Sequence, residues 1–350
     1  MKVGIITVYK SENCGSYLQA WALKSSLEKM GCSVYFVPYK TSDNVLKVGW
    51  RIIKCCLKLR FRTAYFLLKR KILFNKAQRR FPIMNRKKKM DAFIFGSDTI
   101  WNFEAPFFRK NRFFFTGKGI IQLRYTYAIS CGSTPYEFFE QDMVVKEEIA
   151  RFDGISVRDE HMKKILERLF PEKHFLRVLD PTLLLDLSDY DKFACLSPSI
   201  KEFMFIYYFG KISDELFNAI SFFAQKQGLK LVNMGSPDRR FDFNITNNPK
   251  EFIQYFNSAK YILTNTFHGC VFSVLFNKQF VTDGFYKKKV DDFMKRYNLQ
   301  SQYLTEVDAS AVEAKLITPI NYNKINTEIS KERDASLRFL NEIVIKGRTE

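Results

Sequence analysis

The stretch "MKVGIITVYKSENCGSYLQAWALKSSLEKMGCSVYFVPY", residues 1–39, decides the fold of this chain of 350 residues. Its first run, "KVGIITVY", is almost entirely apolar and is typical of a buried strand. The loop "SENCGS" and an amphipathic run that stops at Gly31 predict a turn followed by a helix. "CSVYFVPY" predicts the next strand. A strand–helix–strand unit at this point indicates a parallel sheet with Rossmann-like winding.

The same alternation continues along the chain and starts again in the second half. We predict a helix over 137–152, a strand over 177–185, and four strands alternating with three helices from residue 203 to residue 284. Near Leu187 to Lys201 the composition shifts, which indicates a linker between domains. We therefore predict an α/β protein with two Rossmann-like domains, 1–187 and 188–325, that face a central cleft. A C-terminal helix over 326–350 is expected to pack back on the first domain.

The net charge of +19 is concentrated in one segment. Residues 44–90 contain 16 Lys and Arg and neither Asp nor Glu, which leaves only +3 of the +19 for the rest of the chain. Apolar residues such as Trp50, Ile53 and Leu57 recur there at three- and four-residue intervals between the basic residues. The pattern predicts a basic, amphipathic helical insert in the first domain.

Three interpretations of this insert are open. It could be a solvated pair of helices that covers the sheet with its apolar faces. Its charge could bind nucleic acid, since basic charge dominates such binding. It could also rest on an anionic membrane surface, where each Lys or Arg contributes about 1 kcal/mol and interleaved apolar side chains enter the interface.

Several kinds of site are missing from the sequence. Neither a GxGxxG motif nor a P-loop occurs, which counts against a dinucleotide or ATP enzyme. The seven cysteines include no CxxC pair, and no His, Asp and Glu cluster has metal-ligand spacing, so we expect no metal, no cofactor and reduced thiols. The first residues lack the pattern of a secretory signal, and no run approaches the roughly 20 apolar residues of a membrane span. We expect a cytoplasmic protein.

The segment "TNTFHGC", Thr264 to Cys270, holds one of only three histidines. It joins a predicted strand to a predicted helix, at the edge of an α/β sheet where ligands bind and where helix N–H groups favour anions. Imidazole titrates near neutral pH, so His268 is the candidate for moving a proton. The alternative is a half-buried histidine that caps the turn.

Arg158 ends the strand-like run "ISVRD" and precedes a predicted helix. A guanidinium group can bind a carboxylate or phosphate through two parallel hydrogen bonds, so Arg158 is a candidate anion-binding and catalytic residue. Alternatively, Arg158 pairs with Asp159 or Asp180 and pins the loop.

The motif "GSDTIWN" follows another predicted strand and holds Gly96, Ser97, Asp98 and Trp101. Gly96 would let the backbone approach a ligand, Ser97 would hydrogen-bond to it, and Asp98 would orient a hydroxyl group or act as a base. Asp98 as a helix N-cap and Trp101 as a core residue are the alternatives.

The loop before the first helix offers Asn13, Cys14, Gly15 and Ser16 for binding a ligand at a helix start. A helix cap alone would explain Ser16. A nucleophilic role for Cys14 is disfavoured, because the sequence implies no histidine near it.

Taken in order, several of these motifs resemble the polysaccharide pyruvyl transferases. The matching stretches are "GIITVYKSENCGSYLQAWAL", "FIFGSDTIWN", "TYAISCGS", "ISVRDEHMKKIL", "VLDPTLLL" and "TNTFHGCVFSVLFNKQFV", and together they span Met1 to about Phe285. The resemblance implies a GT-B-like fold and a transferase that moves a carboxyvinyl group from phosphoenolpyruvate to sugar hydroxyls, forming a pyruvate ketal. The sugar is expected to belong to a bacterial surface glycan such as a capsule or exopolysaccharide.

The resemblance also assigns roles to residues of this chain. His268 would move the proton, while phosphoenolpyruvate would lie between the two halves. Its contacts would be Arg158 of the first domain and Asn265, Thr266 and Gly269 of the second, donor-side domain. Many relatives carry an Arg where this chain has Thr266, so either another cation takes the place of that Arg or the donor is different. Asp98, Ser97, Trp101 and the Asn13–Ser16 loop would hold the sugar.

A lipid-linked acceptor would be presented at a membrane, which favours the membrane interpretation of the insert over the nucleic-acid one. We therefore expect a peripheral protein at the inner face of the cell membrane, with phosphoenolpyruvate and a sugar or lipid-linked oligosaccharide as partners and no nucleic acid. A GT-B-like glycosyltransferase that uses a nucleotide sugar and a non-catalytic membrane-docking scaffold are the alternatives. The sequence leaves the oligomeric state open.

Overall fold

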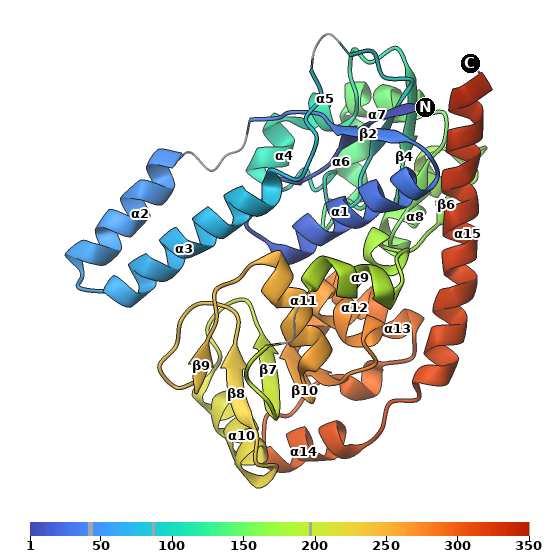
Figure 1. Ribbon diagram of the computed structural model, residues 1–350. Helices are drawn as coiled ribbons and strands as arrows, with labels where there is room; N and C mark the ends of the chain where they lie inside the picture. The colour runs from blue at the N-terminus through green and yellow to red at the C-terminus, as the bar shows by residue number, and fades with distance from the viewer. Residues whose placement is uncertain (41–44, 86–87, 196–197, 350) are drawn as a thin grey trace.

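The computed structural model describes residues 1–40, 45–85, 88–195 and 198–349, and Figure 1 shows the arrangement of its helices and strands. The first half contains a four-stranded parallel sheet in the order β2-β1-β3-β4. Its strands are β1 (Lys2–Ile6), β2 (Ser33–Phe36), β3 (Ala92–Phe95) and β4 (Leu123–Thr126). All four residues of β3 are buried, because helices cover both faces of a parallel sheet.

The helices of the first half include the one predicted from the opening stretch, which begins at Cys14 and ends before Gly31. They are α1 (Cys14–Lys29), α4 (Pro106–Lys110), α5 (Arg112–Phe115), α6 (Tyr136–Gln141), α7 (Met143–Ala150) and α8 (Glu160–Leu169). The single helix predicted over 137–152 is interrupted, because Asp142 leaves helical geometry and accepts a hydrogen bond from the N–H of Val145 to cap α7.

The strand predicted over 177–185 is wrong beyond Arg177. A short parallel pair, β5 (Ser156–Val157) and β6 (Leu176–Arg177), is followed by a 3₁₀ turn, η1 (Pro181–Leu183). Pro181 has no N–H for a ladder, and the carboxylate of Asp180 accepts from the N–H of Thr182 and so starts the turn. This turn carries Asp180 into the site described below.

The second half contains a five-stranded parallel sheet in the order β11-β10-β7-β8-β9. Its strands are β7 (Phe203–Tyr207), β8 (Lys230–Asn233), β9 (Phe243–Asn244), β10 (Tyr261–Thr264) and β11 (Gln279–Thr282). The elements around it are α10 (Asp214–Lys226), α11 (Pro249–Ser258), α12 (Phe267–Leu275), η2 (Gly284–Tyr286), α13 (Lys288–Arg296), η3 (Gln300–Gln302) and α14 (Ala309–Ile317).

The segment predicted as a linker begins with a helix, α9 (Leu187–Ala194), while residues 196–197 lie outside the described residues. Tyr190 of α9 is fully buried and packs against Trp21 of α1 and Phe272 of α12, with ring centroids 5.5 Å apart in both pairs. One apolar cluster accordingly runs through both halves of the chain. This shared core fixes α1 and α12 relative to each other.

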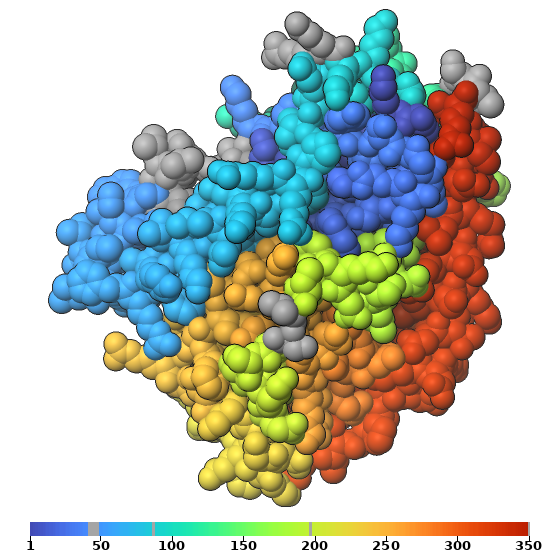
Figure 2. Space-filling view, in the orientation of Figure 1, coloured from blue at the N-terminus to red at the C-terminus, as the bar shows by residue number. Residues whose placement is uncertain are grey.

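The C-terminal helix, α15 (Tyr322–Thr349), runs along both halves, as Figures 1 and 2 show. Near its start, Asn326 donates a hydrogen bond to Asn277 of the second half. Further along, Ser336 accepts from the N–H of Leu179, and Arg348 donates to the carbonyl of Met30 in the first half. Residue 350 lies outside the described residues.

The basic segment forms a helical hairpin of α2 (Val45–Leu57) and α3 (Phe61–Gln78), and its residues 44, 86 and 87 lie outside the described residues. Figure 2 shows the hairpin standing out from one side of the molecule. The second half of α3 is anchored in the body: Phe74 is buried, Arg70 and Lys71 pair with Glu12, and the carbonyl of Ala77 accepts from the hydroxyl of Tyr17. Much of the apolar surface of the hairpin is therefore exposed.

Candidate active site between the two sheets

The carboxyl end of β10 leads directly into α12, and His268 is the second residue of that helix. Thr266 is the N-cap, and its hydroxyl accepts from the N–H of Gly269 at 2.9 Å. A Cβ atom on Gly269 would lie 2.0 Å from Oγ1 of Thr264, so this position requires glycine for packing. The side-chain amide of Asn265 bonds both the N–H and the carbonyl of Phe209. Thr266, Gly269 and Asn265 thus shape the turn that presents His268.

The His268 side chain is 9% exposed and lies where the two halves meet. On one side it contacts α1, because a Cβ atom on Gly15 would be 2.2 Å from Nδ1 of His268. On the other side, Nε2 lies 3.6 Å from Oδ2 of Asp180 and has no hydrogen-bond partner within the described part of the chain. An imidazole nitrogen in this position can take up and release a proton beside a carboxylate.

Arg158 joins this group from the carboxyl end of β5. Its Nη1 donates to Oδ2 of Asp180 at 3.0 Å, and its guanidinium lies over the ring of Phe267, 4.6 Å from the centroid. The pairing with Asp180 that the sequence left open is therefore present. Nη2 of Arg158 is buried and, among the described residues, has no hydrogen-bond partner. A buried N–H group of this kind can bind an anion.

Asp180 is the shared acceptor of the site. Its Oδ1 accepts from the N–H and hydroxyl of Thr182, and its Oδ2 faces Arg158 and His268. Burial by itself would raise the pKa of Asp180, but His268, Arg158 and Thr182 outweigh this and hold the pKa well below its usual range. Asp180 is therefore charged at neutral pH.

Asp98 follows β3 and accepts from the hydroxyl of Ser16 at 2.7 Å and from the N–H of Thr99 at 2.8 Å. Burial raises the pKa of Asp98, but the charges of Arg158, Lys289 and His268 more than offset this, so its pKa is lowered. Asp98 adopts a left-handed backbone with φ of 71° and caps no helix, because the next helix, α4, begins at Pro106.

The other residues predicted near Asp98 hold the fold together. The hydroxyl of Ser97 donates to the side chain of Gln19, and Gly96 packs so closely that a Cβ atom would lie 2.3 Å from the carbonyl oxygen of Tyr127. Trp101 is fully buried, donates to the carbonyl of Phe115 and packs against Phe152. The structure thus places Trp101 in the core of the first half.

The Asn13–Ser16 loop forms the start of α1. The side chain of Asn13 accepts from the N–H groups of Gly15 and Ser16 as the N-cap. The thiol of Cys14 donates to Oδ1 of Asn247 at 2.7 Å, and burial raises the pKa of this thiol well above its usual range. A neutral, buried thiol is a poor nucleophile. Gly15 and Ser16, in contrast, contact His268 and Asp98 directly.

Lys289 is a cation that the sequence prediction missed. It is half-buried near the start of α13 and lines the same narrow cavity as Arg158 and Asp180. Burial lowers the pKa of Lys289, and the charges of Asp98 and Asp180 only partly oppose this. Beside it, Lys287 donates to the carbonyl of Asn265 at 2.7 Å. The sequence signal that could have identified Lys289 is the run "KKK", residues 287–289, which comes shortly after a predicted strand.

The site is therefore a pair of carboxylates, a histidine and buried cations between two sheet edges. Its residues follow the carboxyl ends of β1, β3, β5, β6, β10 and β11, which is where open α/β sheets bind ligands. Within the described residues, no group of three or more His, Cys, Asp and Glu side chains could hold a metal ion. The arrangement suits an anionic substrate whose reaction needs proton transfer.

Comparisons with known proteins agree with this architecture. A family model described as polysaccharide pyruvyl transferase matches residues 13–282. A search of curated proteins found no match.

Three solved structures with the same fold contain UDP or UDP-GlcNAc. The Arabidopsis thaliana protein UGT89C1 with UDP is similar with a TM-score of 0.52 and 10% identity over 99% of both chains. S. aureus MnaA with UDP has a TM-score of 0.53 and 12% identity, covering 100% of this chain and 98% of that one. The UDP-GlcNAc 2-epimerase of Neisseria meningitidis bound to UDP-GlcNAc has a TM-score of 0.51 and 9% identity over 100% of both chains. These likenesses confirm the predicted GT-B-like fold.

Proposed function

The chain belongs to the polysaccharide pyruvyl transferase family, which makes it a transferase, and we propose that it moves the carboxyvinyl group of phosphoenolpyruvate to sugar hydroxyls of a bacterial surface glycan. The product would be a pyruvate ketal. The observation that carries this proposal is the meeting of His268, Asp180 and Asp98 with Arg158 and Lys289 between the two sheets. It combines groups for proton transfer with cations for a small anion.

Phosphoenolpyruvate carries a phosphate and a carboxylate, and both need positive partners. Nη2 of Arg158 is unpaired within the described residues, Lys289 lines the same cavity, and α12 begins beside them. The N–H groups at a helix start add further positive potential. Lys289 is thus the proposed replacement for the Arg that many relatives carry at the position of Thr266.

Ketal formation consumes two sugar hydroxyls and releases one phosphate. One hydroxyl oxygen bonds to the central carbon of phosphoenolpyruvate while the methylene carbon gains a proton and becomes a methyl group. The bond from the central carbon to the phosphate oxygen then breaks, and the second hydroxyl oxygen bonds to the same carbon. Of the two hydroxyl protons, one ends on the methyl group and the other on the released phosphate.

His268 would carry the proton to the methylene carbon, and Asp180 would stabilise its imidazolium form from 3.6 Å. Asp98, held by Ser16 and kept charged by its cationic neighbours, would accept a hydrogen bond from the attacking sugar hydroxyl. These roles assign proton donation and hydroxyl activation to two different groups.

The test is phosphate release from phosphoenolpyruvate in the presence of lipid-linked glycan acceptors. We expect His268→Ala to reduce the rate at least about 100-fold while the circular dichroism spectrum and the melting temperature stay near those of the wild type. His161→Ala, on α8 and 3.1 Å from the carbonyl of Thr134, is the matched histidine control. Full activity of the His268 variant would rule out the proposed role.

A nucleotide-sugar glycosyltransferase is the second candidate, because structures with this fold bind UDP or UDP-sugars. Thermal-shift measurements with phosphoenolpyruvate and with a panel of UDP-sugars separate the two. Stabilisation by a UDP-sugar and none by phosphoenolpyruvate would favour the glycosyltransferase. Stabilisation by neither, together with binding to vesicles, would favour a non-catalytic scaffold.

The proposed location is the inner face of the cell membrane, reached from the cytoplasm. No helix among the described residues is long and apolar enough to cross a membrane. The α2–α3 hairpin supports peripheral binding, because Trp50, Leu57, Leu59 and Phe61 are all exposed among its basic residues. Liposome co-sedimentation should show stronger binding to anionic than to neutral vesicles, and equal binding would contradict the electrostatic part of the proposal.

A further inference from the structure

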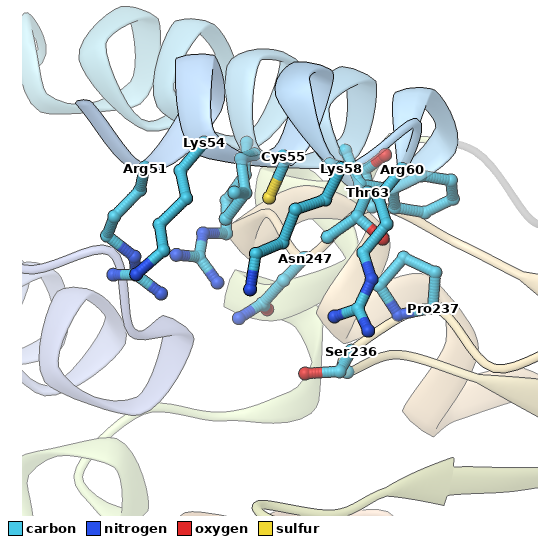
Figure 3. Close-up of a pocket in the computed structure, with 14 residues that line it drawn as sticks. Arg51, Lys54, Cys55, Lys58, Arg60, Thr63, Ser236, Pro237 and Asn247 are labelled. Atoms are coloured by element: carbon cyan, nitrogen blue, oxygen red, sulfur yellow. The ribbon is translucent and has the colours of Figure 1, made fainter. Parts of the chain in front are cut away.

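A second cavity, of about 420 Å³, lies between the α2–α3 hairpin and the loops that follow β8 and β9. Figure 3 shows Arg51, Lys54, Lys58 and Arg60 pointing from the hairpin into this space. Ser236 and Asn247 line it from the second half of the molecule. The volume lies within the range of small-molecule pockets, about 300–1,000 Å³.

Most of the positive charge that lines this cavity has no acidic partner among the described residues. None of its 14 lining residues is acidic. Arg70 at its edge pairs with Glu12 at 2.8 Å, but Arg51, Lys54, Lys58 and Arg60 make no ion pair with any described residue. Four cations with no counter-charge repel one another, and an anion bound among them would relieve that repulsion.

The number and kind of these groups fit a diphosphate. Lys and Arg bind phosphate oxygens through charge-assisted hydrogen bonds, and four cations match an anion with several charges better than a single carboxylate. The hydroxyls of Thr63 and Ser236 and the amide of Asn247 add polar groups in the same lining. These are the residue types that hold phosphate groups in proteins.

A different face of the same hairpin is apolar and exposed. The cavity residues of α2 are 51, 54 and 55, with 58 directly after the end of the helix, whereas Trp50, Ile53 and Leu57 repeat beside them. With about 100° between successive residues, the two series lie on different faces of the helix. Trp50 is 65% exposed, and Tyr65, Leu68 and Ile72 continue the apolar surface along α3. An anion site next to such a surface suits a diphosphate that carries a long apolar chain.

The cavity also lies close to the candidate active site. Oδ1 of its lining residue Asn247 accepts from the thiol of Cys14 at 2.7 Å, and the next residue, Gly15, contacts the ring of His268. The three packed residues Asn247, Cys14 and Gly15 therefore connect the wall of the cavity to the ring of His268.

We propose that this cavity binds the diphosphate through which a glycan acceptor is attached to its lipid carrier. The proposal rests on the proposed function, since it names the class of acceptor for that site. The apolar face of α2 and α3 then lies against the lipid, and the hairpin positions the glycan by its diphosphate.

Binding can be measured separately from catalysis. Inorganic diphosphate, farnesyl diphosphate and UDP are titrated calorimetrically against three proteins: the wild type, the variant Lys54→Gln/Lys58→Gln and the control Lys76→Gln/Arg79→Gln. The two control residues are exposed, lie at the end of α3 and its C-cap, and do not line the cavity. We expect the cavity variant to bind farnesyl diphosphate at least about 10-fold more weakly and the control to match the wild type. Farnesyl diphosphate should bind more tightly than inorganic diphosphate or UDP. Equal affinities of both variants, or tighter binding of UDP, would overturn the proposal.

The rate measurement distinguishes this proposal from the proposed function. Phosphate release from phosphoenolpyruvate is followed with a lipid-diphosphate-linked glycan and with the same glycan freed from its carrier. The cavity variant should raise KM for the lipid-linked glycan at least about 10-fold, and equal changes for both glycans would overturn the diphosphate site alone. Diphosphate binding that depends on Lys54 and Lys58, without phosphate release from any acceptor, would support the site and overturn the transferase proposal.

Discussion

Gly15 and His268 are in contact across the boundary between the two halves of the protein: a Cβ atom on Gly15 would lie 2.2 Å from Nδ1 of the His268 ring. The start of α1 and the start of α12 therefore meet at the imidazole. No side chain larger than hydrogen fits at residue 15 unless the histidine moves.

This contact predicts that Gly15→Ala displaces the imidazole. We expect a loss of phosphate release of at least about 100-fold, because a shift of about 1 Å misaligns a proton donor, and a cost of about 1–3 kcal/mol in unfolding free energy from overpacking. Gly49→Ala is the control, since nothing lies within 4 Å of a Cβ atom there, and in a helix it should raise stability by about 0.5–1 kcal/mol. A Gly15→Ala variant with wild-type kinetics would contradict the proposed position of His268.

Asp180→Asn removes the charge shared by Arg158 and His268. We expect the unfolding free energy at pH 7 to fall by about 3–5 kcal/mol, because the buried Arg158 loses its partner. The folded pKa of Asp180 lies below its unfolded value of about 3.9, so its stabilising effect is present above about pH 4 and is lost as the pH falls toward the folded value.

The difference in urea-unfolding free energy between the wild type and Asp180→Asn should therefore narrow between about pH 5 and about pH 2. Asp186→Asn is the control, since Asp186 makes an ion pair with Arg333 through a largely exposed carboxylate. A constant difference across that pH range would show that the charge of Asp180 does not stabilise the fold.

Lys289→Gln should weaken phosphoenolpyruvate binding by roughly 10- to 100-fold, the effect of losing one hydrogen bond from a charged group. Lys288→Gln, which removes an exposed lysine next to it, is the control. Equal effects of the two substitutions on the calorimetric Kd would exclude a specific role for Lys289.

The pH dependence of donor binding offers a separate test of Lys289. Burial lowers its pKa below the usual value of about 10.4, so its ammonium group loses its proton earlier than an ordinary lysine as the pH rises. The affinity for phosphoenolpyruvate should therefore fall as Lys289 loses its proton. Lys289→Arg should retain this affinity to higher pH, because the guanidinium group stays charged. Identical pH profiles for the wild type and Lys289→Arg would argue against this assignment.

Cys14 should resist alkylation in the folded protein. Its thiol is fully buried, donates to Asn247 and has a raised pKa, whereas Cys195 is exposed. At pH 8, iodoacetamide should label Cys195 at least about 10-fold faster than Cys14, as mass spectrometry of peptides would show. Labelling of Cys14 at the same rate as Cys195 would support a nucleophilic role for Cys14.

The alternation of strands and helices made the fold predictable from the sequence, and with it the edges where His268, Arg158 and Asp98 lie. In parallel sheets the residue that follows each strand is brought to the same edge, so a local pattern predicts a place in space. Local patterns predicted less well where one residue changed the geometry. Pro181 ended the expected strand, and Asp142 divided the expected helix.

The sequence by itself determined the fold class, the family, and the strand-to-helix turn that presents His268. Only the tertiary structure decided which side chains meet. Asp180 joins Arg158 and His268, Lys289 enters from α13, and Trp101 goes to the core, although the sequence places these residues far apart. The physical reason is that helical and strand periodicity follow from neighbours within a few residues. Contacts between sheet edges depend instead on how the shared core around Tyr190 fixes the two halves.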